Sequence, residues 1–262
     1  MPKKKKNKIK VRWKNVFKFL FFVFVIVLII NVIIVICQIN KQNNNTDEII
    51  KKLNKTPISN IVDDKTTKVV PPPEDISKFD SYWDFIKMSL IKVDLTTPIT
   101  INKDTCGWLD FESIDINYPV LCAKNNTHYT THSFDESVNH NGWIFFDKDS
   151  NLETNENIII YGNNNSNDKL LGNINKVFKE SFKNDAENQL IRLYTINSKS
   201  LWQIVSVYHG NDLDDYNLLG KSEVNFTEYI NDNDKILTII ALDKKNIVVK
   251  AKLLKYKPIK TK

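Results

Sequence analysis

The sequence predicts a mainly β domain with flanking helices, placed after a single N-terminal transmembrane helix. One observation behind this is an apolar segment over residues 19–37. The other is a series of short apolar runs from about residue 106, separated by clusters of Asn, Asp and Gly. Short strands with such regular punctuation are typical of a closed barrel or a sandwich, and they argue against alternating βαβ units.

The first 39 residues predict a cytoplasmic tail and a membrane span. Residues 1–18 contain nine Lys or Arg and no acidic residue, and residues 19–37 are apolar except for Asn31. At a rise of about 1.5 Å per residue, this segment covers roughly the 30 Å hydrocarbon core of a bilayer. It is too long for a signal peptide and lacks a small-residue cleavage site. We therefore expect a retained helix over residues 19–39 that crosses the cell membrane once, with the domain after it outside the cell. Asn31 is either a tolerated polar residue or a weak helix–helix contact.

The net charge of +6 comes from the basic tail. Removing its nine basic residues leaves 28 basic against 31 acidic residues, so the rest of the chain is slightly acidic. Nothing in that balance indicates a nucleic-acid-binding surface. With 42% hydrophobic and 26% charged residues, the chain suits one sizeable domain plus appendages. We take the abundance of asparagine as a feature of composition.

Residues 40–75 predict an extracellular stalk. They are polar and end in three consecutive prolines, which favour an extended spacer. Ile49, Ile50 and Leu53 suit a short helix within it. Residues 76–100 are expected to open the folded domain with helical structure. Apolar residues at helical spacing over 75–92 predict an amphipathic helix that packs on the domain.

Eight β-type runs and two helical stretches follow. The predicted strands are Trp108–Phe111, Ile114–Leu121, Gly142–Phe146, Asn157–Tyr161, Gln189–Thr195, Trp202–Tyr208, Lys235–Ile240 and Asn246–Leu254. The predicted helices lie around Leu170–Phe182 and Asn225–Asn231.

Two strand-end motifs carry a family resemblance. The first is Asn157-Ile158-Ile159-Ile160-Tyr161-Gly162-Asn163-Asn164, and the second is Ile236-Leu237-Thr238-Ile239-Ile240-Ala241-Leu242-Asp243, followed by Asn246-Ile247-Val248-Val249. Weaker matches elsewhere, in order, are Ile101-Asn102-Lys103-Asp104 with Gly107-Trp108-Leu109, Ile114–Val120, Gly142–Asp147 and Asn225–Ile230. The ordered set resembles the class B sortases, the cysteine transpeptidases of Gram-positive cell surfaces. The resemblance implies a closed eight-stranded sortase-like barrel over residues 101–257.

The departures from the family fall where its chemistry belongs. In class B sortases the first motif ends in a catalytic His, the second in a nucleophilic Cys, and an Arg opens the next strand. Here these positions hold Asn163, Leu242 and Asn246. Leucine has no lone pair with which to attack a carbonyl, and an amide transfers no proton near neutral pH. Asn246 keeps hydrogen-bond donors but lacks the permanent charge of arginine.

A relocated site is the alternative for an active enzyme. Cys106, Cys122, Ser166 and Ser206 are the candidate nucleophiles, but no triad partner can be assigned to either serine. Lys244 and Lys245 precede Asn246, yet a shift of one residue along a strand reverses the face that a side chain occupies.

The histidines do not complete a site in the sequence. His209 follows a predicted strand and suits a surface or packing position better than a catalytic one. His128, His132 and His140 lie in a polar loop without a helix or a clear carboxylate or Cys partner, so we predict no metal site. The resemblance implies no cofactor.

Cys106 and Cys122 flank a predicted hairpin centred near Ile114. That register places the two cysteines directly opposite each other, as it does Trp108 and Val120. Two readings stay open: a cross-strand disulfide outside the membrane, or two reduced and partly buried thiols.

We therefore expect a membrane-anchored, catalytically inactive pseudosortase at a Gram-positive cell surface, binding a sorting-signal-like peptide or acting as a scaffold for a surface protein. One alternative is an active transpeptidase or hydrolase with a relocated nucleophile. A second is a purely structural interaction protein whose peptide groove is filled by side chains.

Overall fold

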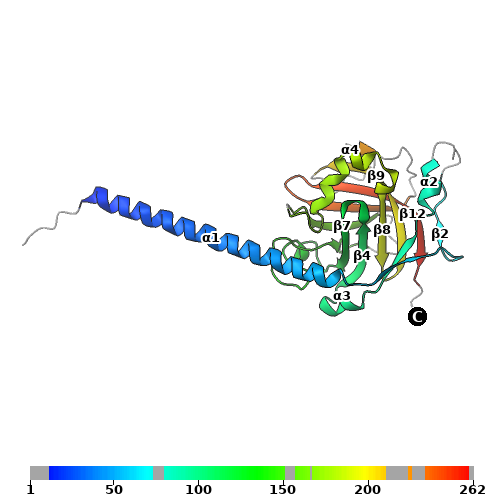
Figure 1. The fold of residues 1–262 in the computed structure, drawn as a ribbon, viewed down its shortest axis with the longest axis horizontal. Coiled ribbons are helices and arrows are strands. Elements are labelled where there is room, and N and C mark those ends of the chain that lie inside the picture. The colour runs from blue at the N-terminus through cyan, green and yellow to red at the C-terminus, as the bar shows by residue number, and fades with distance from the viewer. Residues whose placement is uncertain are drawn as a thin grey trace, which may run out of the picture. The chain divides into compact units, whose positions relative to one another are not determined.

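The computed structural model describes residues 12–72, 80–150, 157–165, 167–210, 224–225 and 234–259 (Figure 1). The chain divides into two compact units, Met1–Asn44 and Asn45–Lys262. The helix α1, Trp13–Leu53, runs through the described part of the first unit into the first residues of the second.

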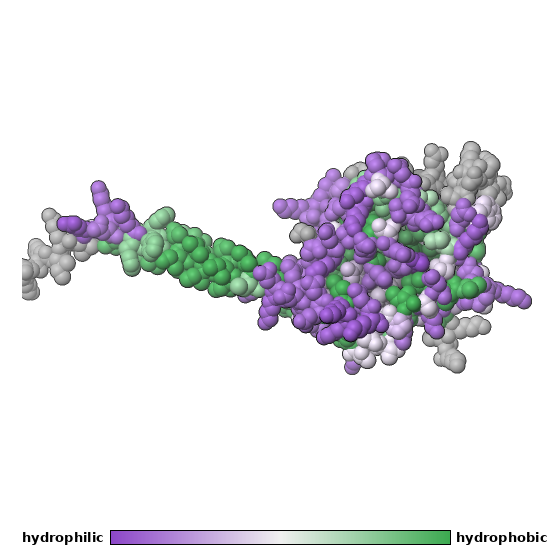
Figure 2. Space-filling model, in the orientation of Figure 1, coloured by the Kyte–Doolittle hydropathy of each residue, from purple (hydrophilic) through white to green (hydrophobic). Residues whose placement is uncertain are grey.

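The apolar part of α1 is a candidate membrane span. By length and composition it is suited to cross a bilayer, and none of its most apolar window is buried within the protein. Figure 2 shows this surface as a continuous hydrophobic band. Asn31 donates its side-chain N–H to the backbone oxygen of Val27 at 2.8 Å, so part of its amide is satisfied within its own helix.

The second unit is built around a closed eight-stranded barrel, as the sequence predicts. Neighbouring strands run in the order β9-β8-β4-β5-β6-β7-β11-β12, and pairing of β12 with β9 closes the ring. The ring comprises β4 (Thr105–Phe111), β5 (Ile116–Cys122), β6 (Phe145–Phe146), β7 (Asn157–Asn163), β8 (Leu190–Thr195), β9 (Ser198–His209), β11 (Ile236–Leu242) and β12 (Ile247–Pro258). Two short strands extend it, β10 (Val224–Asn225) on β9 and β2 (Lys68–Val69) on β12. All eight predicted strands overlap these ring strands.

Aromatic and β-branched side chains fill the core of this unit. All seven residues of β4 and the first six of β11 are buried, so both faces of these strands are covered. Large side chains with at most 1% exposure include Trp108, Phe111, Tyr129, Phe134, Trp143, Phe145 and Phe146.

The helices of the second unit are short. They are α2 (Asp80–Phe85), α3 (Thr96–Ile101) and α4 (Glu180–Lys183), with 3₁₀ turns at Glu112–Ile114, His128–Thr130, Gly172–Phe178 and Ala186–Gln189. The helix predicted around 170–182 is therefore a 3₁₀ segment followed by one turn of α-helix. The helix predicted at 225–231 lies outside the described residues except for Asn225, which belongs to β10.

The amphipathic helix predicted over 75–92 is only partly observed. Residues 73–79 lie outside the described part of the chain, and α2 ends at Phe85. Leu90 instead begins β3 (Leu90–Val93), which pairs with β1 (Ile58–Ile61). The expected apolar contact is present, because Tyr82 and Phe85 are buried in a small second cluster.

Residues 45–70, placed by the sequence in a stalk, belong to the compact second unit. Ile49 and Leu53, one helical turn apart on α1, are buried in the main core. Strands β1 and β2 pair with β3 and β12. The buried apolar residues tie this part of the chain to the folded unit although its composition is polar. The prediction of a free stalk is therefore wrong for residues 45–70.

Candidate functional site

The three positions that resemble the sortase catalytic residues come together at one end of the barrel. Strands β7 and β11 run parallel, and Asn163 is the ladder partner of Leu242 at their last residues. The chain then turns, and β12 begins with Ile247 opposite Ala241. Asn246 occupies the last position of this turn. Adjacent strands lie about 4.8 Å apart, so these residues are close neighbours along the rim.

Asn163 is a structural donor in this geometry. Its side-chain N–H₂ donates to the backbone oxygens of Thr130 at 2.8 Å and His140 at 3.2 Å. These bonds hold the loop 128–142 against the end of β7. Gly142 lets that loop pass close by: its φ is +62°, and a Cβ there would lie 2.4 Å from the backbone oxygen of Tyr129. An amide held in this way positions backbone and supplies no titratable proton.

Leu242 and Asn246 also have structural uses. Leu242 is half-buried and packs against the main hydrophobic core, and its backbone oxygen accepts from Asn164 N–H at 2.9 Å. The side-chain oxygen of Asn246 accepts from the backbone N–H of Asp243 at 3.1 Å, inside the β11–β12 turn. Lys244 and Lys245 are exposed in the same turn.

A second layer of amides surrounds this rim. The side chain of Asn164 donates to Asp243 at 3.3 Å and accepts from Asn175 at 3.3 Å. Asn165 donates to the backbone oxygen of Asn141 at 3.0 Å. These contacts join the residues after β7 to the β11–β12 turn and to the loop 128–142.

Comparison with known proteins identifies the fold and the family. No family model matches the chain. It is 27% identical to sortase B of Staphylococcus aureus over 178 residues, which cover 59% of this chain and 72% of that protein. Sortase B of Listeria monocytogenes is 32% identical over 83 residues, covering 31% of this chain and 34% of the relative. The structure of Clostridium perfringens sortase B matches with a TM-score of 0.55 and 30% identity, over 62% of this chain and all of that one. The chain belongs to the class B sortase family.

One further solved structure bears on ligand binding in class B sortases. A Staphylococcus aureus sortase B–substrate complex matches with a TM-score of 0.55 and 26% identity, over 61% of this chain and 83% of that one.

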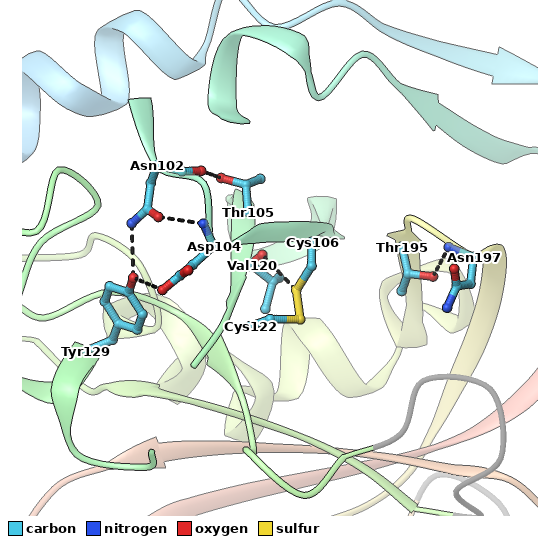
Figure 3. Close-up of a disulfide and its surroundings, with 9 residues drawn as sticks. All are labelled: Asn102, Asp104, Thr105, Cys106, Val120, Cys122, Tyr129, Thr195 and Asn197. Carbon is cyan, nitrogen blue, oxygen red and sulfur yellow. Dashed lines mark hydrogen bonds between the residues drawn. A yellow bond between two sulfur atoms is a disulfide. The ribbon is translucent and has the colours of Figure 1, made fainter. Parts of the chain in front are cut away.

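The cysteines of this class B sortase chain are placed away from the nucleophile position. Cys106 and Cys122 form a disulfide, with their Cα atoms 5.8 Å apart (Figure 3). The free cysteine of the described residues is Cys37, exposed on α1. Within the part of the second unit that the structure describes, both cysteines are oxidised, so neither offers a thiolate.

The hairpin that carries the disulfide differs from the predicted register by one residue. Trp108 pairs with Pro119, and Val120 pairs with Gly107. An irregularity between Thr105 and Gly107 inserts Cys106 as an extra residue in β4. This bulge brings Cys106 to Cys122 despite the shifted register.

A buried polar cluster ties the disulfide hairpin to the loop that Asn163 holds. The side chain of Asn102 donates to the Tyr129 hydroxyl at 3.1 Å, and that hydroxyl donates to Asp104 at 2.7 Å (Figure 3). Burial raises the pKa of Tyr129 well above its usual range. The backbone oxygen of Asp104 accepts from Cys122 N–H at 2.7 Å. Hydrogen bonds therefore link the start of β4, the end of β5 and the turn at Tyr129.

Among the described residues, the serine candidate Ser206 is not part of a catalytic group. Ser206 lies within β9 opposite Lys250 and is fully buried, and its hydroxyl has no hydrogen-bond partner among the residues that the structure describes. A buried hydroxyl without a base is not activated as a nucleophile. Ser166 lies outside the described residues.

The histidines have structural contacts. The rings of His128 and His132 stack with centroids 4.1 Å apart, and His209 stacks on Phe178 with centroids 4.5 Å apart. Strands β12 and β11 lie between His209 and Asn163. Over the described residues, no group of three or more His, Cys, Asp or Glu side chains is placed to hold a metal ion.

Proposed function

We propose that this protein is a membrane-anchored pseudosortase that binds an extended, sorting-signal-like peptide or a surface protein without cleaving it. The observation that carries the proposal is the use of Asn163, Leu242 and Asn246 as structural residues at the barrel rim. Two of these side chains stabilise loops by hydrogen bonds, and the third packs on the core.

The chemistry of the rim supports the loss of transpeptidation. Thioester formation needs a thiolate, a proton donor for the leaving amine, and a fixed positive charge beside the oxyanion. Leu242, Asn163 and Asn246 supply none of these, and the disulfide occupies both Cys106 and Cys122. Three simultaneous replacements leave no partial mechanism to complete.

The retained fold and the anchor support a binding role outside the membrane. The chain shares its barrel with a sortase B solved in complex with a substrate. The basic N-terminal residues and the apolar part of α1 favour a single-pass anchor with the barrel outside the cell. A barrel that keeps this surface while losing its nucleophile suits a receptor or scaffold.

The test uses the full chain in lipid nanodiscs and a panel of fluorescent sorting-signal peptides. Fluorescence anisotropy measures binding, and mass spectrometry detects both cleavage products and covalent adducts. We expect saturable binding of at least one peptide, with neither product nor adduct. The triple variant Asn163→His, Leu242→Cys, Asn246→Arg is the matched control, because it places the family residue types on the same rim.

Cleavage by the unmodified chain would overturn the proposal and favour a relocated nucleophile. Ser206→Ala would then show whether that serine is responsible. The absence of binding to every peptide, together with the absence of cleavage, would favour the purely structural alternative.

A further inference from the structure

The last turns of α1 contact loops that lie next to the candidate site. Three consecutive residues, Asn45, Thr46 and Asp47, make polar contacts with loops far along the chain. Asn45 donates to the Ser137 hydroxyl at 3.0 Å, and Asp47 forms an ion pair with Lys169. One turn later, Ile49 and Leu53 enter the hydrophobic core.

Thr46 is the centre of these contacts. Its side chain is fully buried, and its hydroxyl oxygen accepts from Asn139 at 3.0 Å and from Asn141 at 3.1 Å. Both asparagines are at most 1% exposed. A hydroxyl oxygen has two lone pairs, so these amides use its whole accepting capacity. Buried amides without an acceptor are costly, which makes the arrangement specific to a hydroxyl at this position.

The same asparagines reach the residues that follow β7. Asn141 accepts from Asn165 through its backbone oxygen at 3.0 Å and from Asn167 through its side-chain oxygen at 3.2 Å. Asn163, two residues before Asn165, donates to the backbone of His140, next to Asn141. The backbone N–H of Asn165 also donates to the backbone oxygen of Asn163 at 3.1 Å, so a series of hydrogen bonds runs from Thr46 through Asn141 and Asn165 to the rim position of the family histidine.

We propose that residues 45–53 of α1 are a positioning element for the candidate site, acting through Thr46 on the loop 139–142 and on the residues after β7. The proposal rests on the peptide-binding function for its biological purpose, because these loops border the proposed binding surface. Only the residues from 38 to 44 separate this element from the apolar segment that ends at Cys37. The membrane helix and the elements that shape the site are therefore nearly contiguous in the chain.

The test compares Thr46→Val with Thr46→Ser in the full chain in nanodiscs. Valine keeps the shape and removes the acceptor, whereas serine keeps the hydroxyl. Hydrogen exchange read by mass spectrometry follows the amides of residues 139–142 and 164–169. We expect exchange in both segments to rise about tenfold in Thr46→Val and to remain near the unmodified rate in Thr46→Ser. Ile49→Val is the control, since it loosens core packing on the same helix without touching the amides.

The outcomes separate this proposal from the peptide-binding function. A rise confined to residues 139–142, or equal effects of Thr46→Val and Ile49→Val on residues 164–169, would overturn the positioning role. Should Thr46→Val fail to fold, Asn167→Ala tests the series from its other end and should raise exchange at residues 139–142, because coupling is reciprocal. Faster exchange in both segments of a chain that binds no peptide would support the positioning role and reject the binding function.

Discussion

Replacing Asn163 with Ala tests whether the family's histidine position has become a structural one. The substitution removes two hydrogen bonds, to the backbone oxygens of Thr130 at 2.8 Å and His140 at 3.2 Å. A typical bond of this kind contributes about 1 kcal/mol net. The His140 bond is solvent-exposed, so water replaces much of it. We therefore expect the free energy of unfolding to fall by about 1.5 kcal/mol.

Denaturant titration of the full chain in micelles, followed by tryptophan fluorescence, measures this change. The midpoint should fall with an unchanged slope, which is the signature of altered stability without altered compactness. Asn60→Ala is the matched control, because Asn60 is exposed on β1, and its effect should stay within about 0.5 kcal/mol. The loss of unfolding free energy in Asn163→His should lie between the losses in Asn60→Ala and Asn163→Ala. A neutral imidazole has one N–H donor and can keep one of the two bonds.

Equal stability of Asn163→Ala and the unmodified chain would refute this reasoning. It would mean that the loop 128–142 is held by its other contacts, chiefly the cluster at Tyr129. Asn163 would then be free for a role that the static geometry does not show.

Three further predictions concern the parts of the second unit that support the rim. Leu53→Ala, at a position 1% exposed in the main core, should lower the free energy of unfolding by about 3 kcal/mol, whereas the exposed Lys52→Ala should leave the denaturation midpoint unchanged. Asp63→Ala should lower stability more than Lys255→Met. Asp63→Ala leaves the fully buried Lys255 ammonium without its carboxylate partner at 2.6 Å, whereas Lys255→Met leaves the Asp63 carboxylate in contact with water. Urea denaturation midpoints of the two variants test this order. Burial lowers the pKa of Lys252 to about 8 from 10.5, so the folded state binds fewer protons between these values and stability should rise with pH across that window. In thermal melts from pH 8 to 10.5, the increase of melting temperature with pH should be smaller in Lys252→Met than in the unmodified chain. An identical increase in the two proteins would contradict this prediction.

The barrel was predictable because its strands have clear local signals. Runs such as Ile236–Leu242 are short, β-rich and bounded by turn residues, and each predicted ring strand overlaps an observed one. The pairing register of the β4–β5 hairpin was harder to predict from the sequence. The bulge at Cys106 adds a residue to β4, and no local signal in the sequence separates that geometry from a regular hairpin.

The stalk shows where composition misleads. Residues 40–75 are polar overall, but Ile49 and Leu53 lie one helical turn apart and pack in the core. The strands β1 and β2 depend on partners at residues 90–93 and 255–256, which no local pattern reveals. Helical spacing at 49–53 was the available signal, and these residues continue the helix α1 that begins at Trp13 and runs through the apolar segment.

The amides around the rim were missed for a different reason. Asparagine is common throughout this sequence, so Asn139 and Asn141 carry no distinctive pattern. Their meaning depends on burial and on Thr46, more than 90 residues earlier in the chain. Long-range satisfaction of buried polar groups is a property of the folded structure, and sequence spacing does not encode it.

The rim residues make structural contacts, and these contacts bear on the proposed loss of the family's chemistry. A neutral histidine at 163 has one N–H and cannot donate to both Thr130 and His140, and an arginine at 246 has no oxygen to accept from Asp243. Leu242 contributes apolar packing that a smaller cysteine supplies less fully. Each single reversion towards the family residue therefore weakens a structural contact while restoring only one of three catalytic groups. Under the proposed function, no single reversion both keeps the present rim contacts and restores a complete catalytic group.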